Sequence, residues 1–272
     1  MSGRPASAHR RAIITLTTDF GLQDWYVAAM RGVVLEINPE AQIVDLSHQI
    51  PQGDIETAAF VLAQGRVTFP PDTIHVTVVD PGVGSQRKPI IARCDEHLYV
   101  GPDNGVFQRV FTHATHLKVF ELTHLEYRRS TTSHTFHGRD IFAPAAAHCS
   151  LGVDLHQFGP SLEPETLAHP RGRQTCSSSA TEGTIIYIDH YGNAITDIPG
   201  SFIEERSDWV GIVIEKHSAE IPIGKYYAQA LPGNPIALVG SSSLLEISIN
   251  GQSAATHYDL RVGDRCRILS RA

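Results

Sequence analysis

Two aspartates stand where strand-like apolar runs end, which is where an α/β protein can place acid–base chemistry. Asp19 follows the run 13–17, and Asp80 follows the run 74–79. Because ligands of parallel α/β sheets bind beyond the carboxyl ends of the strands, both carboxylates are expected to face one crevice. The alternative for each is a local role, in which the side chain only caps the turn or helix that follows. Their shared position favours a functional role.

A permanent cation and a titratable ring complete a possible water-activating set. Arg87 ends a loop in which Gly82 and Gly84 allow the backbone to turn tightly. An arginine keeps its proton in proteins, so Arg87 is no simple base, but its charge can hold a water or hydroxide and favour the anion. His137 can titrate near neutral pH and pass a proton. The alternatives are an exposed Asp80–Arg87 ion pair of little energetic weight and a structural histidine, since the chain has 15 histidines.

Other spacings weigh against metal or phosphate chemistry. His134 and His137, like His113 and His116, lie three residues apart, but no carboxylate stands at metalloprotease spacing. The glycine loop after Asp80 is neither a Walker loop nor a dinucleotide-binding fingerprint. We therefore expect no metal and no cofactor.

A second polar group lies in the last third of the chain. Asp189, Tyr191 and Asn193 fall between two strand-like runs. The tripeptide Tyr191-Gly192-Asn193 has residue types that are typical of a turn, and a turn is its simplest interpretation. The functional alternative is an aromatic face with an amide that can read a purine edge. Ser242 and Glu246 belong to a further polar cluster, which by itself indicates only a loop.

The residues around the first set of side chains predict an α/β domain over 1–165. Apolar residues from Val27 to Ile37 recur at helical spacing, and Asp54 can cap a second helix that continues to Gln64. Strand, helix, strand, helix and strand in succession predict a mainly parallel sheet with helices on its faces. The remaining predicted elements are strands at 43–46 and 117–122, a hairpin of 90–93 with 98–100, and helices at 104–111 and 140–151.

The chain changes character after this domain. Serines, threonines, prolines and mixed charges cluster around 166–179, which we interpret as a linker. Over 180–272 the strand-like runs are short and separated by turn residues, which predicts a smaller all-β domain, a barrel or a sandwich. The predicted strands are 183–189, 193–198, 210–214, 235–239, 244–249 and 265–269.

Composition excludes several classes of protein. The 272 residues carry a net charge of −7 and no block of like charges, which argues against a nucleic-acid partner and is compatible with a cationic small molecule. No apolar run approaches the ~18 residues of a membrane span, and residues 1–11 are not followed by the apolar core of a signal peptide. The 4 cysteines are scattered, as in proteins of a reducing compartment. We therefore expect a cytoplasmic protein with no membrane contact.

Several segments together resemble one family, the S-adenosylmethionine hydroxide adenosyltransferases, or hydrolases, whose relatives include fluorinase and chlorinase. The resemblance extends from about Ile13 to Leu269, and the segments occur in the family's order. They are Thr17-Thr18-Asp19-Phe20-Gly21, Val79-Asp80-Pro81-Gly82-Val83-Gly84-Ser85, Gly101-Pro102-Asp103-Asn104-Gly105, Thr135-Phe136-His137-Gly138-Arg139-Asp140, Ile188-Asp189-His190-Tyr191-Gly192-Asn193 and Ser242-Ser243-Leu244-Leu245-Glu246-Ile247.

The resemblance implies hydrolysis of S-adenosyl-L-methionine to adenosine and L-methionine, by a water or hydroxide that attacks C5′. It implies a triad of Asp80, Arg87 and His137 that positions and activates this water. It also implies a homotrimer, with each site between the first domain of one chain and the second domain of the next. The implied substrate-binding residues are Asp19 at the ribose hydroxyls, Tyr191 and Asn193 at the adenine, Tyr226 or Tyr227 as a further aromatic of the adenine pocket, and Asp189 and the Ser242 region with Glu246 towards the methionine end. Phe20 and Phe136 are implied to bind the substrate as well.

Three alternatives remain open from the sequence. A halide-dependent enzyme is disfavoured, because the halogenases of this family have a tyrosine at the position of Asp80 and the fluorinase has a serine at the position of Gly138 and a long insertion after the glycine loop. A protein that senses S-adenosylmethionine or a nucleoside without turnover would keep Asp19 and Asn193 but would not need Arg87 and His137. A metal-dependent phosphohydrolase would lose its activity in EDTA.

Overall fold

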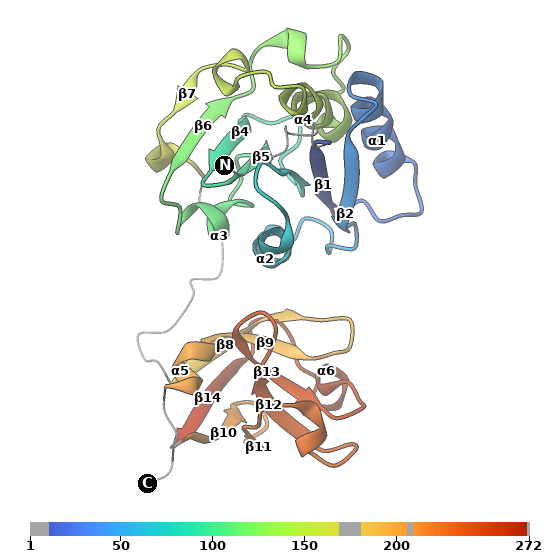
Figure 1. Cartoon of the computed structure of the whole chain (residues 1–272). Helices are drawn as coiled ribbons and strands as arrows, with labels where there is room; N and C mark the ends of the chain where they lie inside the picture. Colours follow the sequence, from blue (N-terminus) through green and yellow to red (C-terminus); the bar gives the residue numbers. More distant parts are fainter. Residues whose placement is uncertain (1–10, 169–180, 206–208, 271–272) are drawn as a thin grey trace, which may run out of the picture. The chain divides into compact units, whose positions relative to one another are not determined.

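The computed structural model describes residues 11–168, 181–205 and 209–270, which form two compact units (Figure 1). The first unit spans Met1–Arg171 and the second Gly172–Ala272. The linker expected at 166–179 lies largely outside the described residues. Within the described ranges, no helix has the length and apolar character that a membrane crossing requires.

A seven-stranded sheet forms the centre of the first unit. Its order is β2 (Gln42–Ser47), β1 (Ile13–Thr18), β3 (Ile74–Val78), β5 (His97–Pro102), β4 (Pro89–Cys94), β6 (Leu117–Glu121) and β7 (Ser161–Leu162). The first four strands in this order are parallel, whereas β4 pairs antiparallel with both β5 and β6. The predicted mainly parallel sheet and the predicted hairpin are therefore confirmed. Thr18 pairs with Val78, so β1 and β3 end level and Asp19 and Asp80 leave the sheet at one edge.

Four α-helices accompany this sheet: α1 (Tyr26–Ile37), α2 (Ile55–Gly65), α3 (Gln108–Phe111) and α4 (Ala143–Ser150). The Asp54 side chain caps α2 by accepting the Thr57 N–H at 3.0 Å, as predicted. The short turns are η1 (Arg66–Thr68), η2 (Leu125–Tyr127), η3 (Gly138–Phe142), η4 (Leu155–Gln157) and η5 (Pro164–Thr166).

Two predicted helices differ from the structure. The helix expected at 104–111 is reduced to α3, because Gly105 has a φ of +98° and the Asn104 amide is held by the Val79 carbonyl at 2.9 Å. The helix expected at 140–151 is divided into the π-helical turn η3 and α4. Pro144 has no N–H to donate, and the carbonyl of Asp140 instead accepts the N–H of Arg129 at 3.0 Å.

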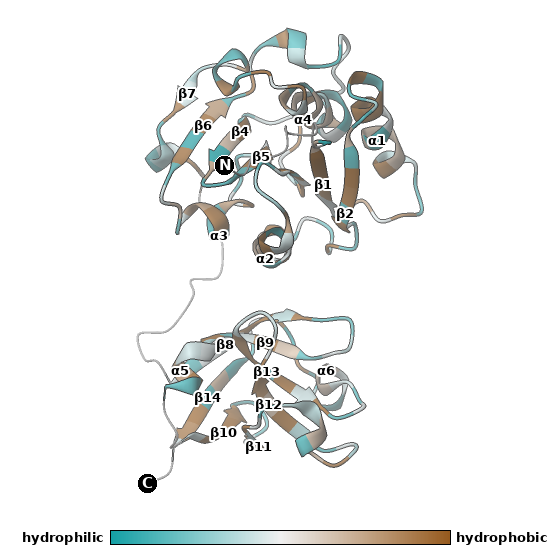
Figure 2. Ribbon diagram, in the orientation of Figure 1, coloured by the Kyte–Doolittle hydropathy of each residue, from teal (hydrophilic) through white to brown (hydrophobic). Residues whose placement is uncertain are grey.

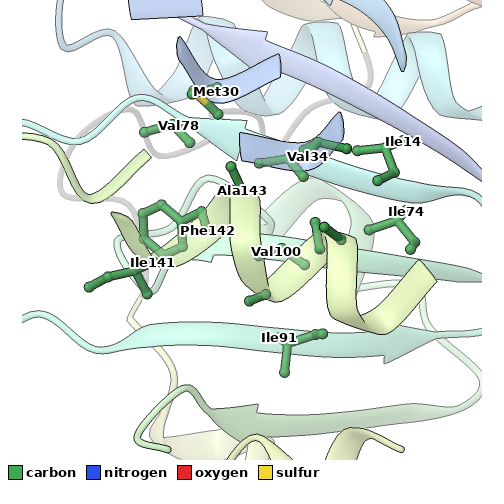
Figure 3. Close-up of a cluster of buried hydrophobic side chains, with 14 of the residues drawn as sticks. Ile14, Met30, Val34, Ile74, Val78, Ile91, Val100, Ile141, Phe142 and Ala143 are labelled. Carbon is green, nitrogen blue, oxygen red and sulfur yellow. The ribbon is translucent and has the colours of Figure 1, made fainter. Parts of the chain in front are cut away.

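Apolar side chains cover both faces of the sheet. On one face, α1 and α4 pack against the central strands through residues that include Met30, Val34, Ile74 and Phe142 (Figure 3). On the other face, a second buried cluster contains residues of α2 and α3. The first unit is therefore a three-layer α/β structure, and Asp19 and Asp80 follow two of its central strands.

The second unit is an antiparallel sheet that nearly closes on itself. Its order is β11 (Ala219–Pro222), β10 (Trp209–Ile214), β14 (Arg265–Ser270), β8 (Glu182–Ile188), β9 (Ala194–Pro199), β13 (Leu244–Ile249) and β12 (Pro235–Val239). A bridge between Ile223 and Ala237 brings the two ends of this order together. The sheet encloses buried isoleucines such as Ile185, and Figure 2 shows hydrophobic stretches along its strands. The predicted barrel-like all-β domain is confirmed, with the short helices α5 (Gly200–Glu204), α6 (Ala254–His257) and η6 (Tyr227–Gln229) added.

Candidate active site

Asp80 and Arg87 form a buried ion pair at the carboxyl edge of the first sheet. Arg87 Nε donates to Asp80 Oδ1 at 3.0 Å and to Oδ2 at 2.9 Å, and Arg87 Nη2 donates to Oδ2 as well. Their side chains are 5 % and 9 % exposed for Asp80 and Arg87 respectively. The exposed pair that the sequence left open as an alternative is therefore wrong, because β3 and β4 bring both residues beneath the protein surface.

His137 joins this pair from a segment fifty residues further along the chain. Its Nδ1 lies 2.6 Å from Arg87 Nη2. A guanidinium can only donate, so Nδ1 is the acceptor and the neutral ring carries its proton on Nε2. Burial and the neighbouring Arg87 charge lower the pKa of His137 below its ordinary value of 6.5. At neutral pH the ring is therefore the acceptor that holds the Arg87 guanidinium.

A cavity of about 430 Å³ opens beside these three residues. Asp19, Phe20, Asp80, Phe136 and His137 all line it, so the structure brings together the site residues that the sequence named in the first unit, apart from Arg87, which reaches the cavity through its two partners. Asp19 also accepts the backbone N–H of Gly53 through Oδ2 at 2.8 Å. The carboxylate is thus held at the cavity wall by the loop before α2.

The sequence analysis did not assign seven further lining residues to the site: Gln52, Gly53, Val78, Pro81, Val83, Thr135 and Gly138. Gln52 and Gly53 precede the Asp54 cap, and Gly53 has a φ of +70°. A glycine beside a helix cap signals a tight turn, but it carries no information about which cavity the turn faces.

Two loops meet closely beside the triad. Gly84 has a φ of +78°, and a Cβ there would lie 2.5 Å from the backbone oxygen of His134. A Cβ at Gly138 would lie 3.1 Å from Met30 Sδ and 3.5 Å from the rings of Phe20 and Phe136. Glycine at position 84 therefore lets the Asp80–Arg87 loop approach the segment that carries His137, and glycine at position 138 lets this segment pack against Met30 and Phe20.

In the second unit, Asp189 organises a tight turn. Its Oδ1 accepts the backbone N–H groups of Tyr191 at 2.9 Å and Asn193 at 2.8 Å, and its Oδ2 accepts the Asn193 amide at 2.9 Å. Gly192 has a φ of +83°, and a Cβ there would lie 2.0 Å from Ser253 Oγ. The predicted turn is confirmed, and its carboxylate is occupied in presenting Tyr191 and Asn193.

Tyr191 and Asn193 line a second cavity of about 560 Å³, which lies in the second unit. Tyr227 lines the same cavity, whereas Tyr226 is 58 % exposed and does not. The other lining residues, which the sequence analysis did not name, are Ile249, Asn250, Gly251, Gln252 and Ser253. Asn250-Gly251 is a recognisable turn signal, but only the barrel brings it next to Tyr191.

Neither Glu246 nor Ser242 lines this cavity, and Glu246 contacts its wall from behind through Tyr227. Glu246 is 5 % exposed, and its Oε1 accepts the Tyr227 hydroxyl at 2.5 Å and the Ser248 hydroxyl at 3.3 Å. Burial raises the pKa of Glu246, and burial with the same hydrogen bond raises the pKa of Tyr227. The Ser242 hydroxyl is buried without a hydrogen-bond partner among the described residues. The structure thus makes Glu246 a support for the Tyr227 ring.

Sequence comparison assigns both units to known domain models. Residues 14–159 match the SAM hydroxide adenosyltransferase N-terminal domain, where SAM is S-adenosylmethionine, and residues 183–267 match the C-terminal domain of the same family. The chain belongs to the SAM hydroxide adenosyltransferase family. All the described residues of the first cavity and of the Asp80, Arg87 and His137 group lie within the first matched segment.

Individual proteins similar to this chain align with nearly all of it and with nearly all of their own length. It is 35 % identical to the (R)-S-adenosyl-L-methionine hydrolase of Salinispora tropica, over 94 % of this chain and 97 % of that protein. A fluorinase of an Actinoplanes species is 24 % identical over 94 % of this chain and 97 % of its own. The crystal structure of an uncharacterized conserved protein from Thermotoga maritima superposes with a TM-score of 0.88 at 30 % identity, covering 94 % of this chain and all of that one.

Proposed function

We propose that this chain is an enzyme that hydrolyses S-adenosyl-L-methionine to adenosine and L-methionine, without a metal or cofactor. The observation that carries the proposal is the buried Asp80–Arg87–His137 arrangement beside a cavity at the carboxyl edge of the first sheet. Membership of the SAM hydroxide adenosyltransferase family and the curated hydrolases at 35 % identity support the substrate and the reaction. The names of those relatives direct attention to the (R) epimer at the sulfonium sulfur.

Activation of the water is the difficult part of this reaction. Sulfur leaves a sulfonium as a neutral thioether, so the leaving group needs neither an acid nor a metal. Water is a weak nucleophile at neutral pH, and a preorganised charge that stabilises its anionic form contributes on the order of 10²–10³ in rate. Arg87 Nε and Nη2 are occupied by Asp80 and His137, and within the described residues Nη1 makes no hydrogen bond. We place the attacking water in the cavity beside Asp80 and His137, where the charge of Arg87, held by both residues, favours its anionic form.

Proton transfer follows from the hydrogen-bond roles. His137 Nδ1 already accepts from Arg87, and its Nε2 carries a proton, so the resting ring has no free lone pair. Asp80 retains acceptor sites besides those used by Arg87. In the proposed step the water oxygen bonds to C5′, the C5′–S bond breaks with its electron pair on sulfur, and the water proton passes to Asp80. His137 keeps the Arg87 guanidinium in place and remains neutral.

The remaining side chains are proposed to bind the substrate. Asp19 accepts the ribose hydroxyls, with Phe20 and Phe136 beside it on the first cavity wall. The second unit contributes Tyr191 and Asn193 at the adenine, where Tyr227 is a better candidate than Tyr226 because it lines the second cavity. Asp189 holds the turn that presents Tyr191 and Asn193, and Glu246 holds the Tyr227 ring. Ser242 is assigned to the methionine end.

We propose that the protein assembles as a homotrimer in the cytoplasm, with each site shared between subunits. The division of the candidate contacts between two units supports a shared site, because neither cavity alone carries both the water-activating triad and the Tyr191 group. The described cysteines are all free, which supports a reducing compartment. Light scattering coupled to size-exclusion chromatography tests the assembly state.

The deciding experiment incubates the purified protein with the separated (R) and (S) sulfonium epimers of S-adenosyl-L-methionine in EDTA, with and without chloride. Chromatography with mass detection identifies the products, and Arg87→Ala is the matched negative control. We expect adenosine and methionine, independent of chelator and halide. A halogenated nucleoside would assign the chain to the halide-dependent relatives instead. Saturable binding of the epimers without turnover would make it a sensor.

A further inference from the structure

Residues 133–139, which include Phe136 and His137, are here called the His137 loop. The buried carboxylate of Asp140 holds both ends of this loop. The Asp140 side chain is 0 % exposed. Its Oδ2 accepts the backbone N–H of Ser133 at 2.8 Å, at the start of the loop. Its Oδ1 and Oδ2 accept Arg139 Nε at 2.7 Å and Nη2 at 2.9 Å, at the end of the loop.

The backbone of Asp140 adds two further attachments. Its N–H donates to the Phe136 carbonyl at 3.2 Å, inside the loop, and its carbonyl accepts the Arg129 N–H at 3.0 Å. The carbonyl is available because Pro144 has no N–H to continue the helix backwards. The π-helical turn η3 that begins at Gly138 is therefore anchored at Asp140 by both its main chain and its side chain.

These contacts reach the walls of the first cavity through Arg139. Its guanidinium, oriented by Asp140, lies 5.0 Å from the centre of the Phe136 ring. Phe136 lines the cavity, and His137 follows it directly. A loss of the Asp140 carboxylate would free Ser133 and Arg139 together, and with them the two ends of the His137 loop.

The carboxylate is ionised despite its burial. Burial opposes ionisation, but hydrogen bonds from Arg139 and the Ser133 amide, with the charge of Arg129 3.7 Å away, lower the pKa of Asp140 below its ordinary value. The charged groups that act on the His137 ring are Arg87 and Arg128, which lower its pKa, and Asp80 and Asp140, which raise it. Asp140 therefore affects both the position and the charge environment of His137.

We propose that Asp140 is a positioning residue of this enzyme, whose ionised carboxylate fixes the His137 loop so that His137 Nδ1 meets Arg87. This role rests on the proposed hydrolysis. Asp140 does not line the cavity and acts through Ser133 and Arg139. A catalytic group displaced by about 1 Å can lose on the order of 10² in rate, so a loop anchored at one residue concentrates this sensitivity there.

The test replaces Asp140 by asparagine, which keeps its size and removes its charge. The amide of Asp140→Asn turns an N–H₂ group towards either Ser133 N–H or Arg139, where two donors then oppose each other. We expect kcat to fall about 100-fold while KM changes little. We also expect the acid limb of the kcat/KM profile to move to higher pH, because a released His137 loop takes the ring away from burial and from Arg87, the two largest effects that lower the pKa of His137. If Asp140 acted on His137 only through its charge, the limb would move to lower pH instead.

The matched control is Asp154→Asn, the same substitution at an exposed aspartate paired with His156. It should leave kcat and the acid limb unchanged. If Asp140→Asn does not fold, Arg139→Met replaces it, since Met keeps apolar contact with Phe136 and leaves the Ser133 bond to Asp140 intact. Arg139→Met should also lower kcat while KM changes little, but the fall in kcat should be smaller than in Asp140→Asn. Wild-type kcat and an unmoved limb in the folded variant would overturn the proposal.

A readout without substrate separates this proposal from the proposed hydrolysis. The His137 ring signals, assigned by comparison with His137→Gln, can be titrated by NMR in the free protein. Asp140→Asn should raise the His137 pKa, because the ring loses burial and Arg87, and shift the Arg87 side-chain signals, whether or not the wild-type protein hydrolyses S-adenosylmethionine. An unchanged or lowered His137 pKa would overturn the positioning role. An inactive wild-type protein in which Asp140→Asn still raises the His137 pKa would overturn only the hydrolysis.

Discussion

Arg87 and Asp80 lie against each other as a buried pair, with Arg87 Nε 2.9 Å from Asp80 Oδ2 and 3.0 Å from Oδ1. Buried ion pairs of this kind are weak evidence for stability, because removing two charges from water costs about as much as their attraction returns. The removal of one partner is different, since it leaves the other charge buried and unpaired. The intact pair therefore adds little to stability, and its proposed role is in catalysis, whereas a variant that lacks one partner should lose both stability and activity.

Arg87→Ala and Asp80→Ala should each lower both activity and stability. We expect kcat to fall at least about 10²–10³-fold in each. We expect the free energy of unfolding to fall by about 3–5 kcal/mol in each, because the remaining charge is buried without its partner. Urea unfolding and product chromatography measure the two effects. The double variant Asp80→Asn with Arg87→Met should recover much of the stability and none of the activity; recovery of activity would contradict the triad assignment.

Acid should inactivate the enzyme through His137. The pKa of His137 lies below its ordinary value of 6.5, mainly because of burial and also because of Arg87. The ring must be neutral to accept from Arg87, so activity is retained above this lowered pKa and lost as the pH falls through it. A rate profile of kcat/KM between pH 4 and 8 should show this limb below pH 6.5. His137→Gln should remove the limb together with most of the activity; a limb that persists in this variant would belong to another group.

Substitution of Asp19 should affect substrate binding more than the chemical step. Asp19→Asn keeps an acceptor for the Gly53 N–H but loses the charge assigned to the ribose hydroxyls. A hydrogen bond to a charged group contributes about 1.5–3 kcal/mol, which corresponds to at least tenfold in KM. Steady-state kinetics with both sulfonium epimers measure KM and kcat separately. An unaltered KM would argue against the ribose role.

Gly84 should tolerate a side chain less well than another glycine with a similar backbone. Gly84 has a φ of +78° and Gly152 a φ of +91°, but only at Gly84 would a Cβ lie 2.5 Å from a backbone oxygen, that of His134. Alanine costs about 1–2 kcal/mol at either position from the left-handed backbone alone. Gly84→Ala should therefore lose more stability than Gly152→Ala, and activity as well, because the His137 loop must move. Equal losses in urea unfolding and wild-type activity for both would contradict this close contact.

Local patterns in the sequence predicted most of the elements that carry the site. Helical spacing from Val27 to Ile37, the Asp54 cap and the strand-like runs before Asp19 and Asp80 depend on neighbours a few residues away, so they can be recognised in the chain itself. The two helices that differed were altered by longer-range contacts, joined in the helix expected at 140–151 by the local effect of Pro144. Asn104 is held by Val79, and the Asp140 carbonyl by Arg129.

The sequence by itself determined which residue types could activate water and the edge of the sheet where two of them lie. Only the tertiary structure decided that His137 accepts from Arg87, that Asp140 anchors the His137 loop, and that Tyr227 lines the second cavity while Glu246 lies behind it. The reason is physical. Periodicity and capping are set within a few residues, whereas burial and hydrogen-bond roles between distant residues exist only after the strands and helices have packed.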